Sequence, residues 1–168
     1  TSVITRTSTC KYYISILVEV NEVDATPKPI SENKAVGIDL GIKTFAALSD
    51  GTEIQNHKYL KRSIKKVKLL QRSLSKKAKS SKNREKARLR LARAHERVCN
   101  QRNEFLHQVT HRLVANYDTI CLETLSASNM VKNHRLAQAL EDIAINRFNT
   151  LLEYKAKKHG VNILRIGR

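Results

Sequence analysis

Asp39 lies inside an apolar stretch, VGIDLGIKTFAALSDG, that runs from Val36 to Gly51. Side chains alternate between the two faces of a strand, so Asp39 shares its face with Gly37 and Gly41, and the apolar residues occupy the other face. The glycines leave room around the carboxylate for another backbone or an ion. A charged group in a central strand is costly unless it is paired or binds a metal, which makes Asp39 a candidate metal ligand.

Glu123 ends a second apolar run, YDTICLE, which begins at Tyr117. If this strand pairs in parallel with the strand of Asp39, both carboxylates emerge on one side of the sheet. Two carboxylates make a seat for Mg²⁺ (or Mn²⁺), a hard ion that takes its other ligands from water and phosphate. A pair of such ions about 4 Å apart activates a water and stabilises the leaving oxygen of a phosphodiester. The alternatives are a buried salt bridge or a turn cap for Asp39 and a solvated strand end for Glu123.

The charge of the chain indicates a polyanionic partner. Its 168 residues carry 32 Lys and Arg against 15 Asp and Glu, a net charge of +17. Nucleic acid is the commonest partner of such a chain, because cationic side chains release the counterions of phosphates. An anionic membrane surface or an acidic protein is the alternative.

The cysteines and the hydropathy indicate a cytoplasmic protein. The three cysteines, Cys10, Cys99 and Cys121, are far apart and form no Cys-x-x-Cys pair, so we expect neither a disulfide framework nor a zinc site in this chain. No apolar run is long enough to span a bilayer, and no signal peptide is visible. The first residue is Thr1 rather than methionine, which indicates a processed product or a piece of a longer chain.

The order of elements predicts an α/β fold with a mixed sheet. An antiparallel meander comes first, a long helical section follows, and a strand–helix–strand unit with parallel strands ends the chain. We expect strands at 12–20, 35–45, 45–48, 52–56, 117–123 and 161–166, a loop at 126–135, and helices in 57–115 and at 136–158. Gly160 follows the last helix at the position favoured for a C-cap.

Helical periodicity from 57 to 115 predicts two long helices folded into an antiparallel hairpin, with a polar break at 79–83. Acidic residues are few in this segment, whereas an ordinary solvated helix face alternates both signs. We therefore expect the hairpin to contact a nucleic-acid backbone. Aromatic residues are scarce there, so base stacking is not expected to be the main mode. The candidate contacts are Lys65, Lys66, Arg72, Lys76, Lys77, Lys79, Lys82, Arg84, Arg88 and Arg93.

Four sequence blocks together resemble the TnpB-type (OrfB) proteins of bacterial insertion sequences, which contain a ribonuclease H-like nuclease domain of the RuvC type. The blocks are GIDLGIKTFAALSDG, the basic segment KLLQRSLSKKAKSSKNREKARLRLARAHERVCNQRNEFLHQVTHRLV, ICLETLSASNM and FNTLLEYKAKKHGVNILRIGR. The resemblance implies a transposon-encoded, RNA-guided DNA endonuclease from a bacterium or archaeon, related to the type V CRISPR effectors. It also implies that Asp39 and Glu123 are the first and second catalytic carboxylates and that DNA and a guide RNA are the partners.

The resemblance also implies what this chain lacks. The family's third carboxylate and its zinc ribbon of paired Cys-x-x-Cys motifs lie beyond the last expected strand, and its N-terminal nucleic-acid-recognition region lies before Thr1. Residues 1–168 are therefore expected to form a partial RuvC domain that includes the basic hairpin at 57–115. With two of three metal ligands, the fragment itself is expected to cleave little or nothing. Zn²⁺ is expected only in the missing part.

Two other functions remain open on the sequence. The first rival is a nucleic-acid-binding module without nuclease activity, in which the carboxylates are vestigial. The second rival is an ATPase of the actin-like or sugar-kinase type, because GIDLG also opens the phosphate-binding strand pair of those enzymes. Those enzymes place a hydroxyl-rich turn after this motif and are much longer, whereas Lys43 follows it here. The sequence contains no glycine-rich phosphate loop and no Ser or Cys nucleophile signature.

Overall fold

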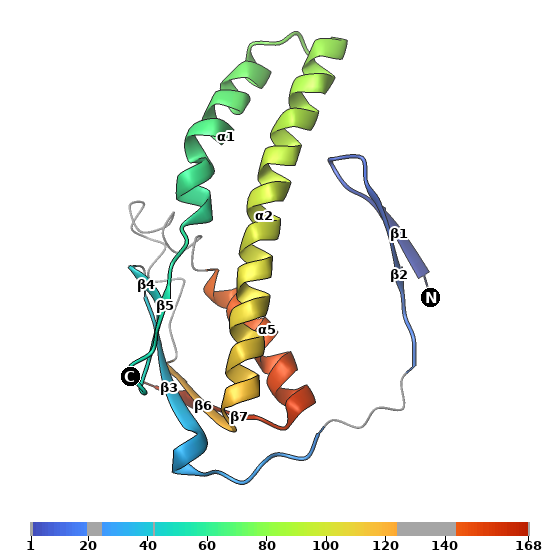
Figure 1. The fold of residues 1–168 in the computed structure, drawn as a ribbon. Coiled ribbons are helices and arrows are strands. Elements are labelled where there is room, and N and C mark those ends of the chain that lie inside the picture. The colour runs from blue at the N-terminus through green and yellow to red at the C-terminus, as the bar shows by residue number, and fades with distance from the viewer. Residues whose placement is uncertain (1, 20–24, 42, 124–143, 168) are drawn as a thin grey trace. The chain divides into compact units, whose positions relative to one another are not determined.

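A computed structural model describes residues 2–19, 25–41, 43–123 and 144–167. It has an α/β fold with a mixed sheet, as the sequence predicts (Figure 1). The elements in chain order are β1 (Ser2–Arg6), β2 (Tyr12–Ile16), the 3₁₀ turn η1 (Glu32–Lys34), β3 (Ala35–Leu40), β4 (Thr44–Leu48), β5 (Glu53–Gln55), α1 (Tyr59–Ser75), α2 (Lys82–Asn116), β6 (Thr119–Glu123), α5 (Ile145–His159) and β7 (Asn162–Ile166).

The chain divides into two compact units, which we describe separately. The first unit comprises Thr1–Glu22 and Arg62–Gln101, and the second comprises Val23–Lys61 and Arg102–Arg168. We call the first the helical unit and the second the sheet unit. No described helix is both long enough and apolar enough to cross a membrane.

The sheet unit contains a five-stranded sheet in the order β5-β4-β3-β6-β7. β3 pairs antiparallel with β4, and β4 pairs antiparallel with β5. On its other side β3 pairs in parallel with β6, which pairs in parallel with β7. Helix α5 connects β6 to β7, because parallel neighbours need a crossover connection rather than a tight turn.

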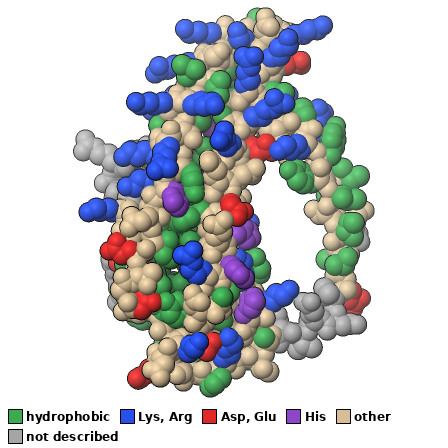
Figure 2. Space-filling view, viewed as in Figure 1, with side chains coloured by type: hydrophobic (Ala, Val, Ile, Leu, Met, Phe, Trp, Pro, Cys, Tyr) green, Lys and Arg blue, Asp and Glu red, His purple; other side chains and the backbone are tan. Residues whose placement is uncertain are grey.

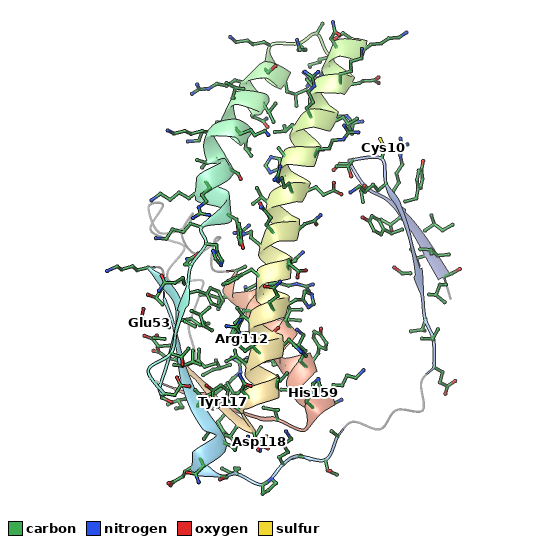
Figure 3. The ribbon with its side chains drawn as sticks, viewed as in Figure 1. Cys10, Glu53, Arg112, Tyr117, Asp118 and His159 are labelled. Atoms are coloured by element: carbon green, nitrogen blue, oxygen red, sulfur yellow. The ribbon has the colours of Figure 1, made fainter. Side chains whose placement is uncertain are left out.

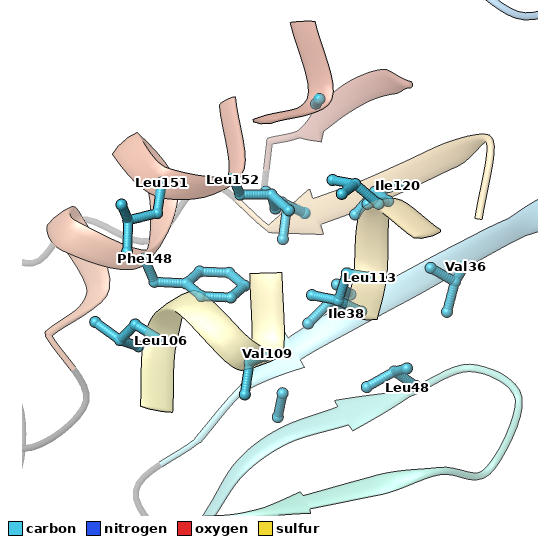
Figure 4. Close-up of a cluster of buried hydrophobic side chains, with 14 of the residues drawn as sticks. Val36, Ile38, Leu48, Leu106, Val109, Leu113, Ile120, Phe148, Leu151 and Leu152 are labelled. Carbon is cyan, nitrogen blue, oxygen red and sulfur yellow. The ribbon is translucent and has the colours of Figure 1, made fainter. Parts of the chain in front are cut away.

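One face of this sheet carries the hydrophobic core. Val36 and Ile38 of β3 lie beside Ile120 and Leu122 of β6, and all four are buried. The C-terminal part of α2 and helix α5 cover these residues (Figure 4). The helices contribute Leu106, Val109, Leu113, Val114, Ile145, Phe148, Leu151, Leu152 and Ala156. Burial of each large apolar side chain stabilises the fold by about 1.5–3 kcal/mol, so this core holds the sheet together.

An irregularity in the pairing of β4 with β5 turns Phe45 into the core. The register shifts between Thr44 and Ala46, and both Phe45 and Ala46 are fully buried although they are adjacent in the chain. The Phe45 ring meets the ring of Phe148 edge-on at 5.5 Å between centroids. A bulge re-aims one side chain of a strand in this way.

In the helical unit, α1 and the N-terminal part of α2 form the expected pair of helices. Ala87, Leu91 and Val98 are buried. Arg84 closes the turn between the helices, because its Nη1 donates hydrogen bonds to the carbonyl oxygens of Leu74 at 3.2 Å and Lys77 at 3.1 Å. Leu74 lies in the last turn of α1 and Lys77 just after the helix, so neither carbonyl has a hydrogen-bond donor four residues further on within α1.

The N-terminal residues differ from the expectation. The strand predicted at 12–20 is shorter, and it does not join the main sheet; it pairs with β1, a strand that the sequence analysis missed, in a separate two-stranded ribbon. The tip of this ribbon contacts α2, where Glu96 accepts hydrogen bonds from Thr9 and Lys11. The ribbon escaped prediction because β1 is only five residues long and mostly polar in pattern.

Two further boundaries differ or cannot be compared. The strand expected at 35–45 ends at Leu40, because the chain turns at Gly41 before β4 begins. The predicted loop at 126–135 and the first part of the helix predicted at 136–158 lie outside the described residues; the described helix begins at Ile145.

Residues 25–28 cross the beginning of β7 and are tied to it. The N–H of Lys28 donates to the carbonyl oxygen of Gly160 at 2.9 Å, and Asn162 Nδ2 donates to the carbonyl oxygen of Lys28 at 2.8 Å. Gly160 itself has φ +67°, and an added Cβ would lie 2.4 Å from the carbonyl oxygen of Thr26. The helix end therefore needs glycine for its backbone conformation and for the close passage of this segment.

Gly160→Ala is expected to lower the free energy of unfolding by about 3 kcal/mol, because it combines left-handed strain with a steric clash. Gly51→Ala is the matched control: Gly51 has φ +86° with open space around it, so only the strain of about 1–2 kcal/mol applies. Urea unfolding followed by circular dichroism measures both. Equal losses in the two variants would show that the contact with Thr26 is unimportant.

Candidate functional site

The two candidate carboxylates lie side by side at the end of two neighbouring parallel strands. The register pairs Gly37 with Cys121 and Ile38 with Leu122, and the next residues of the two strands are Asp39 and Glu123. Because Val36 and Ile38 point into the core, Asp39 points to the opposite face of the sheet. The structure therefore brings together the two residues that the sequence singled out.

The face that carries Asp39 and Glu123 is hollowed. A depression of about 510 Å³ is lined by both carboxylates and by Gly37, Ile38, Ala47, Leu48, Ser49, Cys121 and Ile166. Asp39 is exposed and Glu123 is half-buried. Small residues form most of the floor next to Asp39, which leaves space above the carboxylate for an ion or a phosphate group.

Three hydrogen bonds at the two ends of the β3–β4 pairing fix the position of Asp39. On one side of it, the N–H of Gly37 donates to Ser49 Oγ at 3.0 Å, and the N–H of Ser49 donates to the carbonyl oxygen of Gly37 at 2.9 Å. On the other side, the N–H of Gly41 donates to the carbonyl oxygen of Phe45 at 3.1 Å. A Cβ on Gly41 would lie only 2.9 Å from the carbonyl oxygen of Thr44, so a larger residue would displace the turn that follows Asp39.

A third carboxylate, Glu53, belongs to the same row across the sheet. Glu53 pairs with Ala47 and Ala47 pairs with Asp39, so all three side chains face the same way. Glu53 is labelled on β5 in Figure 3. Two strand spacings of about 4.8 Å separate it from Asp39. The sequence analysis missed this position, although the alternation in the strand predicted at 52–56 was available to indicate it.

The described residues fit part of a site for a hard divalent cation. Asp39 and Glu123 supply carboxylate oxygens, the ligand type that Mg²⁺ prefers. Within 2–19, 25–41, 43–123 and 144–167, no group of three or more His, Cys, Asp or Glu side chains lies close enough to hold a metal ion. The two carboxylates would thus supply only part of a cation's coordination shell, and the other ligands would come from water, a phosphate or other protein groups.

The opposite end of these strands is held by polar contacts. The Tyr117 hydroxyl donates a short hydrogen bond to the Asp50 carboxylate, which joins the turn after β4 to the beginning of β6. Lys28 Nζ donates to Asp118 Oδ1 at 2.7 Å. Figure 3 labels Tyr117 and Asp118 at this end of the sheet. Asp50 is thus a turn residue that also clamps two strands.

The candidate nucleic-acid contacts lie on the two helices of the helical unit and on the turn between them, which holds Lys76, Lys77 and Lys79. Figure 2 shows Lys and Arg side chains gathered there. Eight of the ten candidates are exposed: Lys65, Lys66, Arg72, Lys76, Lys79, Lys82, Arg88 and Arg93. Lys77 and Arg84 are half-buried, and Arg84 is already engaged with the carbonyls of the interhelical turn. Its guanidinium therefore has a structural role that the sequence analysis did not foresee.

One face of α1 concentrates these cations. A hollow of about 600 Å³ is lined by Lys65, Lys68, Leu69, Arg72, Ser73 and Lys76, which recur at helical spacing. Helix α1 contains no acidic residue at all. Like charges three or four residues apart destabilise a helix by about 0.2–0.5 kcal/mol per pair. A bound polyanion would remove this repulsion, so the face is suited to phosphates.

Comparison with known proteins identifies the family. The model of the OrfB family, described as "probable transposase", matches residues 15–134. A "putative RNA-guided DNA endonuclease" of Streptomyces pristinaespiralis is 38% identical over 168 residues, which are 100% of this chain and 41% of that protein. InsQ of Escherichia coli K12 carries the same description and is 38% identical over 123 residues, 73% of this chain and 30% of InsQ. The chain belongs to the OrfB family of probable transposases.

This chain spans less than half the length of those two relatives. Among solved structures, a chain of the cryo-EM structure of a Cas12f1–sgRNA–target DNA complex is similar, with a TM-score of 0.58 and 18% sequence identity over 99% of this chain and 35% of that chain. At this identity the likeness shows that the two folds are alike.

Tyr117→Phe is expected to change the pH dependence of stability. The hydrogen bond to Asp50 raises the pKa of Tyr117 to about 12 and lowers the pKa of Asp50. A raised tyrosine pKa gives stability that is present below the unfolded pKa of about 10 and lost as pH rises to about 12. Tyr117→Phe should lower the free energy of unfolding by about 1 kcal/mol at pH 8, and the difference from the wild type should vanish above the folded pKa.

Urea unfolding of both proteins between neutral and alkaline pH measures this difference. Because lysines also titrate there, only the difference between the two proteins reports Tyr117. A constant difference across the range would contradict the clamp.

Proposed function

We propose that this chain is part of a transposon-encoded, RNA-guided DNA endonuclease, in which the sheet unit is the front portion of a ribonuclease H-like (RuvC) domain. The observation that carries the proposal is the parallel register of β3 and β6, which brings Asp39 next to Glu123 on a hollowed face. The relatives described as RNA-guided DNA endonucleases and the Cas12f1 fold support it. The whole protein would hydrolyse DNA phosphodiesters while a guide RNA selects the sequence by base pairing.

Asp39 and Glu123 would hold the divalent cation, Mg²⁺ or Mn²⁺. When bound, such an ion supplies an activated water and stabilises the leaving oxygen of the phosphodiester. The chain's own residues orient this site: Ser49 and Gly41 fix the strand of Asp39, and the core residues of β6 fix Glu123. The described residues contribute two carboxylates, so this chain alone should cleave DNA weakly or not at all.

The basic face of α1 would contact the phosphate backbone of the bound nucleic acid. Exposed lysines and arginines at helical spacing position a backbone and do not read its sequence. This division of work fits an enzyme in which base pairing with a guide reads the sequence. A nuclease-inactive binding module remains the second candidate, because the described residues contain no third carboxylate close to Asp39 and Glu123.

Asp39→Ala is expected to lower Mg²⁺-dependent DNA cleavage by the full-length protein at least about 1,000-fold, because an essential metal ligand is lost. Nucleic-acid affinity should stay nearly unchanged, since Asp39 lies outside the basic face. Glu104→Ala, which removes one carboxylate from α2 on the covered side of the sheet, is the matched control and should cleave normally. Retained cleavage in Asp39→Ala would refute the metal assignment, and a wild type that binds but never cleaves would favour the binding module.

Removal of the four cations that line the α1 hollow should weaken binding to duplex nucleic acid in a salt-dependent way. The Lys65→Ala, Lys68→Ala, Arg72→Ala, Lys76→Ala variant is expected to reduce the slope of log affinity against log salt by about 3.6, the value for four lost phosphate contacts on duplex DNA. The control with equal charge loss is Lys34→Ala, Arg147→Ala, Lys157→Ala, Lys158→Ala in the sheet unit. Fluorescence anisotropy at several salt concentrations measures both. Equal slope changes would show that net charge, not the α1 face, drives binding.

A further inference from the structure

A chain of aromatic rings runs from the core of the sheet unit to its surface. The Phe45 ring lies 5.0 Å from the Phe105 ring, edge to face, and Phe105 lies 5.0 Å from His57 in the same geometry. His57 and Tyr59 lie 5.4 Å apart with their planes inclined by only 34°. Phe45 is fully buried, whereas His57 is exposed and Tyr59 half-buried. The outer two rings are thus held in contact, tilted toward each other, with the Phe105 ring beneath both of them.

The backbone between these two rings is strained. Lys58 has φ +49°, a left-handed conformation that costs a non-glycine residue about 1–2 kcal/mol. Its N–H donates to Asn56 Oδ1 at 3.0 Å, which stabilises the turn. Strained residues of this kind gather at sites that hold ligands. The turn brings His57 and Tyr59 alongside each other at the beginning of α1.

The ring pair lies at the same end of the sheet as the carboxylates, the end at which β3 and β5 finish. β5 runs in the same direction as β3, because each is antiparallel to β4. Gln55 pairs with Thr44, so the end of β5 lies beside the turn that follows Asp39. Two strand spacings, about 10 Å in all, separate β5 from β3. The rings pack on Phe105 of α2, on the covered side of the sheet, whereas the carboxylate hollow lies on the opposite face.

We propose that His57 and Tyr59 form a stacking platform for a base of single-stranded nucleic acid at this end of the sheet. This inference rests on the proposed function and adds a binding site for a base to the backbone contacts of α1. Aromatic rings stack on every type of base, and the gain is about 1–3 kcal/mol per base. Lys61, two residues after Tyr59, is exposed and adds a positive charge for a phosphate near the beginning of α1. A single-stranded nucleic acid bound here would have one base fixed at the end of the sheet that carries Asp39.

The alternative is that Tyr59 only anchors the beginning of α1, as an apolar residue does in a hydrophobic staple. A leucine would serve that purpose as well as a tyrosine, whereas stacking requires a ring. Tyr59→Leu and Tyr59→Phe therefore distinguish the two roles. His57→Gln, which removes the exposed ring, tests the other half of the platform.

The test compares two fluorescent oligonucleotides of equal length and charge with the 168-residue chain: single-stranded oligo(dT) and an abasic strand with the same sugar–phosphate backbone. Fluorescence anisotropy gives the affinity ratio of the two probes. We expect the wild type and Tyr59→Phe to prefer the strand with bases by about fivefold or more, as one stacked base predicts. Tyr59→Leu and His57→Gln should lose most of this preference and keep their affinity for the abasic strand.

The outcomes separate this inference from the proposed function. An unchanged preference in both Tyr59→Leu and His57→Gln would overturn the platform while leaving backbone binding in place. A wild type that binds neither probe would contradict nucleic-acid binding itself. If Tyr59→Leu unfolds at lower urea concentration than the wild type, the exposed His57→Gln variant decides the matter, because its ring contributes little to the core.

Discussion

The parallel register of β3 with β6 is the constraint on which the candidate site depends. Val36 pairs with Ile120 and Ile38 with Leu122, and all four side chains are buried. A slip of one residue would move this apolar set to solvent and turn the carboxylates into the core. Hydrophobic burial therefore fixes the position of Asp39 beside Glu123. The site's geometry thus follows from the packing of the core on the other face of the sheet.

Polar contacts at the far end of the sheet support the same register. The N–H of Asp118 donates to the carbonyl oxygen of Lys34 at 2.8 Å, and the Tyr117–Asp50 hydrogen bond joins β6 to the turn after β4. Polar contacts thus tie the sheet unit at the end where β3 and β6 begin. The helical unit has a different role. Its cationic side chains repel one another, and a bound polyanion would stabilise the unit by neutralising them.

The sequence was sufficient to predict those parts of the fold and the site that depend on side-chain burial and alternation within one strand or helix. The alternation around Asp39 predicts both the core face of β3 and the face of the carboxylate, and Gly160 predicts the end of α5. It was insufficient where the cause lies in tertiary contacts. Nothing in the local pattern shows that Arg84 caps the interhelical turn, that a bulge turns Phe45 inward, or that β2 pairs with a short β1 instead of joining the sheet. Glu53 was missed because its relation to Asp39 depends on the pairing of two strands through Ala47.

A double-mutant cycle of Mn²⁺ binding tests the central claim most directly, because the claim is that Asp39 and Glu123 act on one ion. Electron paramagnetic resonance measures bound Mn²⁺ in the 168-residue chain, in Asp39→Asn, in Glu123→Gln and in the double variant, over the millimolar range suited to a site with few protein ligands. The account predicts one ion whose affinity falls in each single variant, with no further loss in the double variant. Binding that is absent in the wild type, or equal in all four proteins, would contradict it.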